Sequence, residues 1–195
     1  MSERPDWVQI GIWGDSIIHG GRDTVMGGWV TRLKMYCVSR QLGDHIFNLG
    51  LGGNNSTEVR NRIDAEIVAR TVHIDHAFVS VGVNDITNKS KLTSPEVYEE
   101  NLQRIIEIIR ARGKSPHLLT MTPIQRALEE WHQYNDIIVR TAKTCKAGLI
   151  DLRRCDLTEH TADGVHPDAA GHEKIFQDVK AQLLAQGIIP AESEV

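Results

Sequence analysis

Long apolar runs and blocks of positive charge are both missing from this sequence. No stretch approaches the roughly 18 uninterrupted apolar residues of a membrane-spanning helix, so we expect no membrane span. The formal net charge is -4, and lysine and arginine are not gathered in a basic block. Neither nucleic acid nor an anionic membrane is therefore expected as the main partner.

Cysteine is scarce, and no secretory leader is evident. The three cysteines, Cys37, Cys145 and Cys155, are odd in number, and their spacing matches no metal-binding or redox motif. Free thiols of this kind favour a reducing compartment. The opening segment, MSERPDWVQI, is polar and lacks the apolar core of a signal peptide. We therefore expect a cytoplasmic protein.

Repeats, low-complexity tracts and linkers rich in Pro, Gly or Ser are also absent from the sequence. The length of 195 residues suits one domain. The shares of 41% hydrophobic and 25% charged residues are ordinary for a globular protein with a full core. We expect a single domain over residues 1–195.

The sequence does contain an alternation of short apolar runs with longer segments of helical periodicity. The runs predict strands at 7–13, 45–51, 76–83, 117–123 and 147–152. The longer segments predict helices at 27–42, 56–70, 94–112, 127–145 and 167–186. Strands that alternate with helices favour an α/β fold, with a mostly parallel sheet covered by helices on both faces.

The helix predicted at 94–112 has the clearest pattern. Its apolar stripe consists of Val97, Leu102, Ile105, Ile106 and Ile109. Ser94 is the expected N-cap, and Pro95 is expected at the first helical position. By the same reasoning, Pro167 is predicted to start the last helix.

Polar motifs follow four of the predicted strands. They are GDS (14–16), GLGGNNS (50–56), GVND (82–85) and DGVHP (163–167). Ligands of parallel α/β sheets bind beyond the carboxyl ends of the strands. The motifs are therefore predicted to bring Ser16, Gly53, Asn84, Asp163 and His166 to one edge of the sheet.

Ser16, Asp163 and His166 are the residue types that nucleophilic catalysis at an acyl group requires. A serine hydroxyl is a poor nucleophile until a base accepts its proton. His166 suits that role, because histidine titrates near neutral pH. Asp163 would fix the imidazole tautomer and stabilise the imidazolium. Each residue alone is more simply explained as a turn or surface residue, but their joint placement favours a triad.

Gly53 and Asn84 are candidates for stabilising an oxyanion. Negative charge develops on the carbonyl oxygen during acyl transfer, and preorganised donors stabilise it. Gly53 has no side chain to keep a substrate from its N–H, and Asn84 carries a side-chain amide. The backbone N–H of Ser16 would be a third donor. A turn-forming role is the alternative for both Gly53 and Asn84.

In their order and spacing, the four motifs resemble the conserved blocks of the SGNH hydrolases, also called the GDSL family. The resemblance spans nearly the whole chain; one departure is GDSI, where the family name has leucine. It implies a flavodoxin-like, three-layer α/β/α fold with a five-stranded parallel sheet of order 2-1-3-4-5. It also implies a triad of Ser16, Asp163 and His166, and an oxyanion hole formed by Ser16, Gly53 and Asn84.

Three further polar residues lie beside these motifs. Asp15 and Asp85 are interpreted as hydrogen-bonding and capping groups that border the pocket. His19 is expected either to line the pocket or to face solvent. The triad and the oxyanion donors complete the chemistry, so neither a cofactor nor a metal ion is expected.

The resemblance implies hydrolysis of a small-molecule carboxylic ester through an acyl-enzyme. The connections between the predicted elements are short and polar, and none is long enough for a helical lid. We therefore expect short acyl or acetyl esters of soluble molecules. Two alternatives stay open: a metal-dependent phosphoesterase that uses Asp15, Asn84, Asp163 and His166 as ligands, and a non-catalytic flavodoxin-like binding module.

Overall fold

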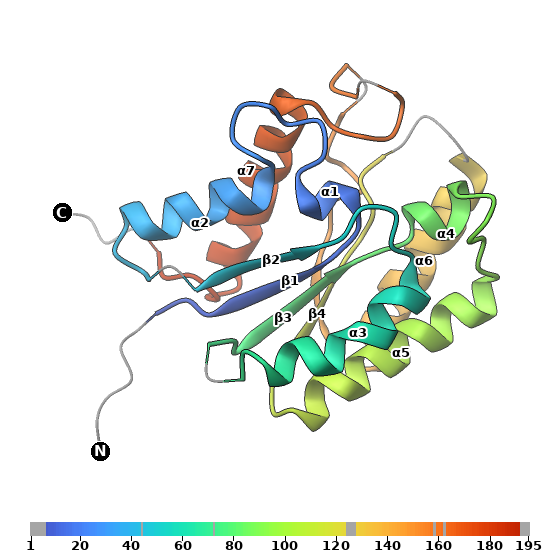
Figure 1. The fold of residues 1–195 in the computed structure, drawn as a ribbon, viewed down its shortest axis with the longest axis horizontal. Coiled ribbons are helices and arrows are strands. Elements are labelled where there is room, and N and C mark those ends of the chain that lie inside the picture. Colours follow the sequence, from blue (N-terminus) through green and yellow to red (C-terminus); the bar gives the residue numbers. More distant parts are fainter. Residues whose placement is uncertain are drawn as a thin grey trace.

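The computed structural model describes residues 7–43, 45–71, 73–123, 128–157, 159–161 and 163–191. Its centre is a single sheet of five parallel strands in the order β2-β1-β3-β4-β5 (Figure 1). The strands are β1 (Ile10–Gly14), β2 (Ile46–Gly50), β3 (His76–Ser80), β4 (Ser115–Leu119) and β5 (Gly148–Ile150). Each of the five predicted strands is therefore present.

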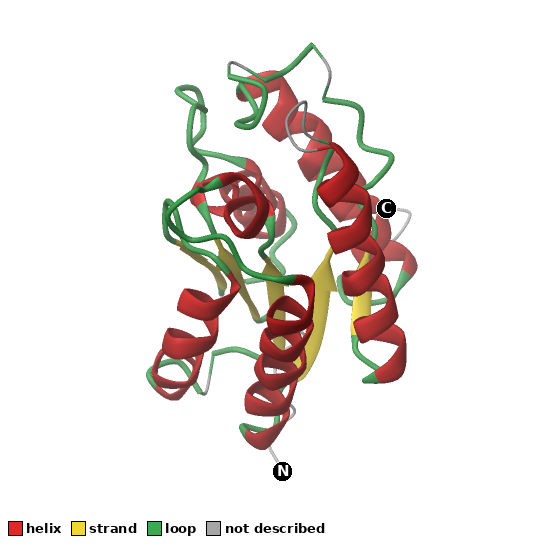
Figure 2. Cartoon of the chain, turned by 90° about the vertical axis from the view of Figure 1, so that its right-hand side faces the viewer, coloured by secondary structure: helices red, strands yellow, loops and turns green. Residues whose placement is uncertain are grey.

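Helices cover both faces of this sheet (Figure 1, Figure 2). α2 (Trp29–Ser39) and α7 (Ala169–Ala185) lie on one face, and α3 (Ser56–Val68), α5 (Pro95–Ala111) and α6 (Leu128–Thr144) lie on the other. This arrangement confirms the expected three-layer, flavodoxin-like fold and its strand order. Among the described residues, no helix is long and apolar enough to cross a membrane.

β1 is an internal strand of the sheet and is buried along its whole length. It pairs with β2 on one side and with β3 on the other, so that Ile10 lies opposite both Ile46 and His76. All five residues of β1 are buried. Because helices cover both faces, the strand is apolar along its whole length instead of alternating with polar residues.

The N-terminal end of α5 confirms one prediction and corrects another. Ser94 is the N-cap and accepts a hydrogen bond from the Val97 N–H at 3.4 Å, with Pro95 at the first helical position. The prediction that Val97 belongs to the apolar stripe is wrong, because this residue is 45% exposed. Val97 lies five residues before Leu102, about 140° around the helix axis, and the buried position in this turn belongs to Tyr98.

The prediction that Pro167 starts the last helix is also wrong. Asp168 is the N-cap of α7, and its side chain accepts a hydrogen bond from the Gly171 N–H at 2.8 Å. Pro167 precedes the cap and pairs with Thr161 in an isolated β-bridge. The aspartate side chain satisfies a free N–H of the first turn, which a proline at that position could not do.

Two short helices were not predicted. α1 (Ser16–His19) follows β1, and α4 (Val83–Thr87) follows β3. α4 contains the end of the segment predicted as a strand at 76–83, so β3 stops at Ser80. Both helices begin within polar motifs, and they therefore determine where the candidate site residues lie.

A pair of histidines lies on β3 and β4, away from the polar motifs, with His117 buried and His76 half-buried. His76 Nδ1 is 3.0 Å from His117 Nε2, and the His117 ring stacks on Phe78 with 4.3 Å between ring centroids. Burial lowers the pKa of His117 to about 4, and burial also lowers the pKa of His76. Both rings are therefore neutral at pH 7, and protonation of His117 opposes folding.

We predict that His117 makes the fold sensitive to acid. The unfolded chain takes up this proton near pH 6.5 and the folded chain only near pH 4, so stability is lost as the pH falls through that window. At pH 5 the free energy of unfolding should be lower by up to about 2 kcal/mol. Urea denaturation at pH 7 and pH 5 measures this loss.

The His117→Gln variant should lose less stability than the wild type between these pH values. His132→Gln is the matched control, because His132 is exposed on α6 and should leave the loss unchanged. An equal loss in His117→Gln and in the wild type would contradict the prediction.

Candidate active site

The structure brings Ser16, Asp163 and His166 together at the carboxyl end of β1. Ser16 is the first residue of α1. Its Oγ lies 2.8 Å from His166 Nε2, and His166 Nδ1 lies 2.8 Å from Asp163 Oδ2. A carboxylate only accepts hydrogen bonds, so Nδ1 carries the imidazole proton and Nε2 accepts from the serine hydroxyl. This is the tautomer that a general base for Ser16 requires.

Asp163 is held as a carboxylate by its own turn. Its Oδ1 accepts the backbone N–H groups of His166 at 2.9 Å and Val165 at 3.1 Å, which leaves Oδ2 for the imidazole. The His166 N–H is the largest influence, and with the imidazole and the Val165 N–H it lowers the pKa of Asp163 to about 2 against the effect of burial. Asp163 is therefore charged across the physiological pH range.

Arg22 is a neighbour of this group that the sequence motifs did not indicate. Its guanidinium Nη2 lies 3.7 Å from Asp163 Oδ2, and its side chain is mostly exposed. The backbone of Arg22 has a φ of 73°, which is uncommon for a residue with a side chain. Because the charge is exposed, this ion pair contributes little to stability.

The segment after α1 is anchored to α7, and this anchoring keeps Ser16 beside His166. The buried Arg32 guanidinium pairs with Asp23 and also donates to the Ala169 carbonyl at 3.1 Å. His172 Nε2 lies 3.2 Å from the Gly21 carbonyl oxygen. Burial opposes the charge on Asp23, but hydrogen bonds from Arg32 and from backbone N–H groups hold its pKa well below the usual range. The segment after α1 and the start of α7 are thus fixed to each other next to the site.

Asp15 lies at the N-cap of α1, where it accepts the Ile17 N–H at 2.9 Å. The residue is 3% exposed. Burial raises its pKa to about 6, although the Ile17 N–H and the nearby His166 act in the opposite direction. Asp15 therefore helps to form the helix that begins with Ser16. The side chain is charged at pH 7 even though burial disfavours that charge.

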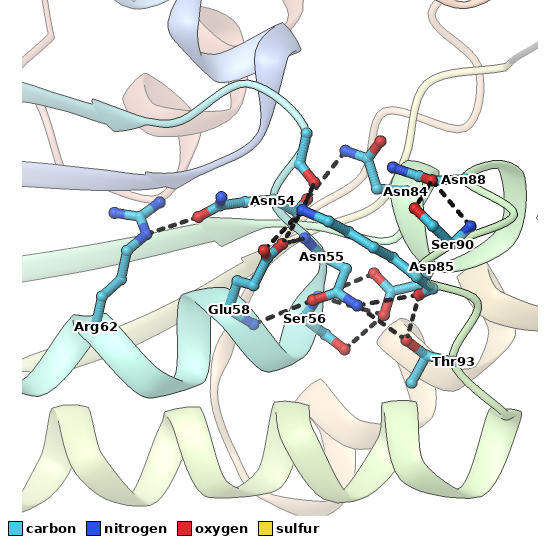
Figure 3. A network of polar contacts seen from close by, with 12 residues as sticks. Asn54, Asn55, Ser56, Glu58, Arg62, Asn84, Asp85, Asn88, Ser90 and Thr93 are labelled. Atoms are coloured by element: carbon cyan, nitrogen blue, oxygen red, sulfur yellow. Dashed lines mark hydrogen bonds and ion pairs between the residues drawn. The ribbon is translucent and has the colours of Figure 1, made fainter.

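Gly53 and Asn84 are joined through the loop that follows β2. Asn84, on α4, donates from Nδ2 to the Asn54 carbonyl at 3.0 Å (Figure 3). Gly53 has a φ of 79°, a left-handed conformation that glycine adopts without strain. Across the part of the chain that the structure describes, the Gly53 N–H donates no hydrogen bond. It is therefore available to a ligand, as is the second amide hydrogen of Asn84.

Asp85 joins two helices near the site, and His19 faces solvent. Asp85 is buried and accepts the Ser56 N–H at 3.0 Å and the Ser56 hydroxyl at 2.6 Å, which joins α4 to α3 (Figure 3). Burial raises the pKa of Asp85, while the hydrogen bonds from Ser56 act in the opposite direction. His19 ends α1 and is exposed.

Two basic residues that the motifs did not indicate hold the ends of β1 and β2. Arg62, on α3, donates to the Gly14 carbonyl at 3.1 Å and to the Asn54 side chain at 2.9 Å. Lys91 donates from Nζ to the Gly53 carbonyl at 3.0 Å. The Gly14 and Gly53 acceptors are main-chain carbonyls, which every residue carries, so no sequence signal identifies these two contacts. Within the described ranges, no group of three or more His, Cys, Asp or Glu residues is arranged to hold a metal ion.

We predict that Asp15→Asn stabilises the fold at pH 8. The raised pKa means that the folded wild type loses stability as the pH rises from about 4 through about 6, while asparagine keeps the cap without a charge. The gain should be on the order of 1–3 kcal/mol at pH 8 and close to zero at pH 4. Chemical denaturation at both pH values measures it.

Asp168→Asn serves as the control for replacing a capping aspartate, because Asp168 caps α7 at a less buried position. A pH-independent difference between Asp15→Asn and the wild type would contradict the prediction.

Comparison with known proteins places the chain in a family. Residues 12–174 match the GDSL-like lipase/acylhydrolase family. A curated relative, the uncharacterized lipoprotein YqeF of Bacillus subtilis, is 26% identical in an alignment of 150 residues that covers 63% of this chain. The chain spans 59% of the length of that relative.

Solved structures share the fold at low sequence identity. The acetylxylan esterase Axe2 of Geobacillus stearothermophilus superposes with a TM-score of 0.76 at 20% identity, covering 93% of this chain and 96% of Axe2. LAE5, an alpha/beta hydrolase enzyme from the metagenome of Lake Arreo in Spain, gives 0.72 at 23% identity, again covering 93% and 96%. The family match covers residues 12–174, which is most of this chain. It shows that the chain belongs to the GDSL-like lipase/acylhydrolase family of carboxylic ester hydrolases.

Proposed function

We propose that the chain hydrolyses small carboxylic esters through an acyl-enzyme formed on Ser16. The observation that carries this proposal is the 2.8 Å contact between Ser16 Oγ and His166 Nε2, across 150 positions of sequence. Asp163 supports it by fixing the imidazole at 2.8 Å. Among the relatives, Axe2 has been studied as catalytic mutants in which a serine or a histidine is replaced by alanine.

In the acylation step, His166 Nε2 takes the proton of the Ser16 hydroxyl as Oγ attacks the ester carbonyl carbon. The tetrahedral intermediate collapses when the C–O bond to the alcohol breaks and His166 returns the proton to the departing oxygen. Asp163 stabilises the imidazolium that exists between these two transfers. The alcohol leaves, and the acyl group stays on Ser16.

In the deacylation step, water takes the place of the alcohol. His166 accepts a proton from the water as its oxygen attacks the acyl carbon, and then gives that proton to Ser16 Oγ. The acid product leaves, and the free hydroxyl is restored. The same two side chains therefore serve both halves of the reaction.

The oxyanion of both intermediates would be bound by three donors, namely the N–H groups of Ser16 and Gly53 and the Nδ2 amide of Asn84. The Gly53 N–H and one hydrogen of the Asn84 amide are the unoccupied donors described above. Preorganised donors of this kind typically contribute several kcal/mol to lowering the barrier, about 2.7–4 for one donor.

Short acyl groups are the proposed substrates. The connecting segments 88–94 and 157–162 are short and mostly polar in sequence, which favours a site without a channel for a long alkyl chain. Axe2 and a second structural relative, AlAXEase, are acetyl xylan esterases. We propose acetyl and other short acyl esters of soluble alcohols, including acetylated sugars.

The wider protein context is also part of the proposal. We propose that residues 1–195 form one SGNH-hydrolase domain. A cytoplasmic location stays a prediction, because the curated relative is named a lipoprotein.

We predict that Ser16→Ala abolishes ester hydrolysis and leaves the fold intact. Loss of the attacking oxygen in a triad typically lowers kcat by several orders of magnitude. Hydrolysis of p-nitrophenyl acetate and the thermal unfolding temperature are measured on the same preparation. Substantial hydrolysis by the pure variant, or labelling of another serine by a fluorophosphonate, would overturn the proposal.

We predict that activity survives removal of metal ions. Neither proton transfer in the proposed mechanism needs a metal. Overnight dialysis against EDTA, followed by the same assay, should leave kcat unchanged. Inactivation that a divalent ion reverses would favour the metal-dependent phosphoesterase, and p-nitrophenyl phosphate would then be the substrate to test.

We predict that kcat/KM is greatest for acyl chains of about two to four carbons. Each added methylene is worth about 0.8 kcal/mol only where a pocket receives it. A series of p-nitrophenyl esters from two to sixteen carbons tests this, with Ser16→Ala as the blank for spontaneous hydrolysis. A maximum at twelve carbons or beyond would show a hydrophobic channel for the chain.

A further inference from the structure

We propose that Lys91 is a positioning residue that sets the direction of the Gly53 N–H towards the oxyanion. This inference rests on the proposed function, in which Gly53 is an oxyanion donor. Lys91 lies in the polar loop after α4, and its Nζ donates to the Gly53 carbonyl at 3.0 Å. The surrounding polar network joins this loop to the start of α3 (Figure 3).

Gly53 needs an external restraint. Glycine populates positive and negative φ about equally, so the observed φ of 79° is one of several accessible conformations. A Cβ placed on Gly53 would meet no atom within 4 Å, so side-chain packing does not select this conformation. Hydrogen bonds remain as the restraint, and the first is the Asn54 N–H, which donates to the Leu51 carbonyl at 3.1 Å and closes the turn that contains Gly53. Lys91 holds the Gly53 carbonyl, and Asn84 holds the Asn54 carbonyl.

Lys91 is itself fixed from both ends. Its ammonium donates to the two Glu58 carboxylate oxygens at 2.7 and 2.9 Å, and its carbonyl accepts from Asn55 Nδ2 at 3.0 Å. Glu58 also accepts the Asn55 N–H at 3.0 Å in the capping box of α3. Burial opposes the charge, but the Lys91 ammonium and the Asn55 N–H hold the pKa of Glu58 below its usual range. Lys91 therefore connects the Gly53 carbonyl to the rigid start of a helix.

Loss of the Lys91 contact is expected to weaken binding of the transition state more than binding of the substrate. The direction of the Gly53 N–H matters most once the carbonyl oxygen has become an oxyanion. An interaction made only in the transition state lowers kcat and kcat/KM together when it is lost. Removing an oxyanion donor lowers kcat by about 10²–10³. Loosening one donor should cost less, about 5–30-fold, because Asn84 and the hydrogen bond from the Asn54 N–H to the Leu51 carbonyl still hold the loop.

The first experiment compares three single variants with p-nitrophenyl acetate. Lys91→Met keeps the length of the side chain and removes the ammonium, and it should lower kcat and kcat/KM by about 5–30-fold. Lys91→Arg keeps a cationic donor and should recover most of the activity. Lys89→Met is the matched control, because Lys89 is an exposed lysine in the same loop, and it should behave as the wild type. Thermal unfolding is measured for each.

The second experiment measures the rate at which a fluorophosphonate labels Ser16. The phosphonyl oxygen occupies the oxyanion site in the adduct, so this rate should fall in Lys91→Met by a factor similar to that of kcat. Lys91→Met combined with Asn84→Ala should lose less than the product of the two single losses, because both residues act on one group of donors.

The inference is overturned if Lys91→Met retains wild-type kcat and labelling rate, or if Lys91→Arg is as impaired as Lys91→Met. It is also overturned if only KM rises, which would make Lys91 a substrate contact. Failure of the proposed function looks different, because Ser16→Ala would then remain active. An inactive Ser16→Ala beside a fully active Lys91→Met removes only the role of Lys91.

Discussion

The common direction of the five strands is the constraint on which the candidate site depends, because every strand delivers its following loop to the same edge of the sheet. The ends of β1, β2 and β3 carry Ser16, Gly53 and Asn84 respectively. α1 packs closely against the end of β2, since a Cβ on Gly50 would lie 2.3 Å from the His19 nitrogen. Only glycine at that position lets α1 lie across the end of β2.

Asp15 illustrates a conflict between stability and chemistry at this edge. Its carboxylate caps α1, so it orients the helix that begins with Ser16, yet burial disfavours its charge. The same negative charge lies close enough to His166 to interact with it. An anion there favours the imidazolium that the proposed mechanism forms. A residue chosen for stability alone would be neutral at this position.

The sequence predicted the parts of the site that follow strand ends. The motifs around Ser16, Gly53, Asn84 and His166 could be placed because parallel strands share an edge, and the distances from His166 to Ser16 and Asp163 agree with that placement. Their catalytic roles remain proposals.

Two kinds of feature could not be predicted. Lys91 and Arg62 bind main-chain carbonyls, and a carbonyl looks the same in every sequence. The short helices α1 and α4 are too brief to show a helical period.

The hydrogen bond between Ser16 and His166 also has a consequence for synthesis of the chain. The proposed nucleophile is synthesised 150 positions before its proposed base. A growing chain therefore holds an inert serine. In the proposed mechanism, ester cleavage requires both side chains in place, so the appearance of activity would report completed folding and not merely the presence of the serine.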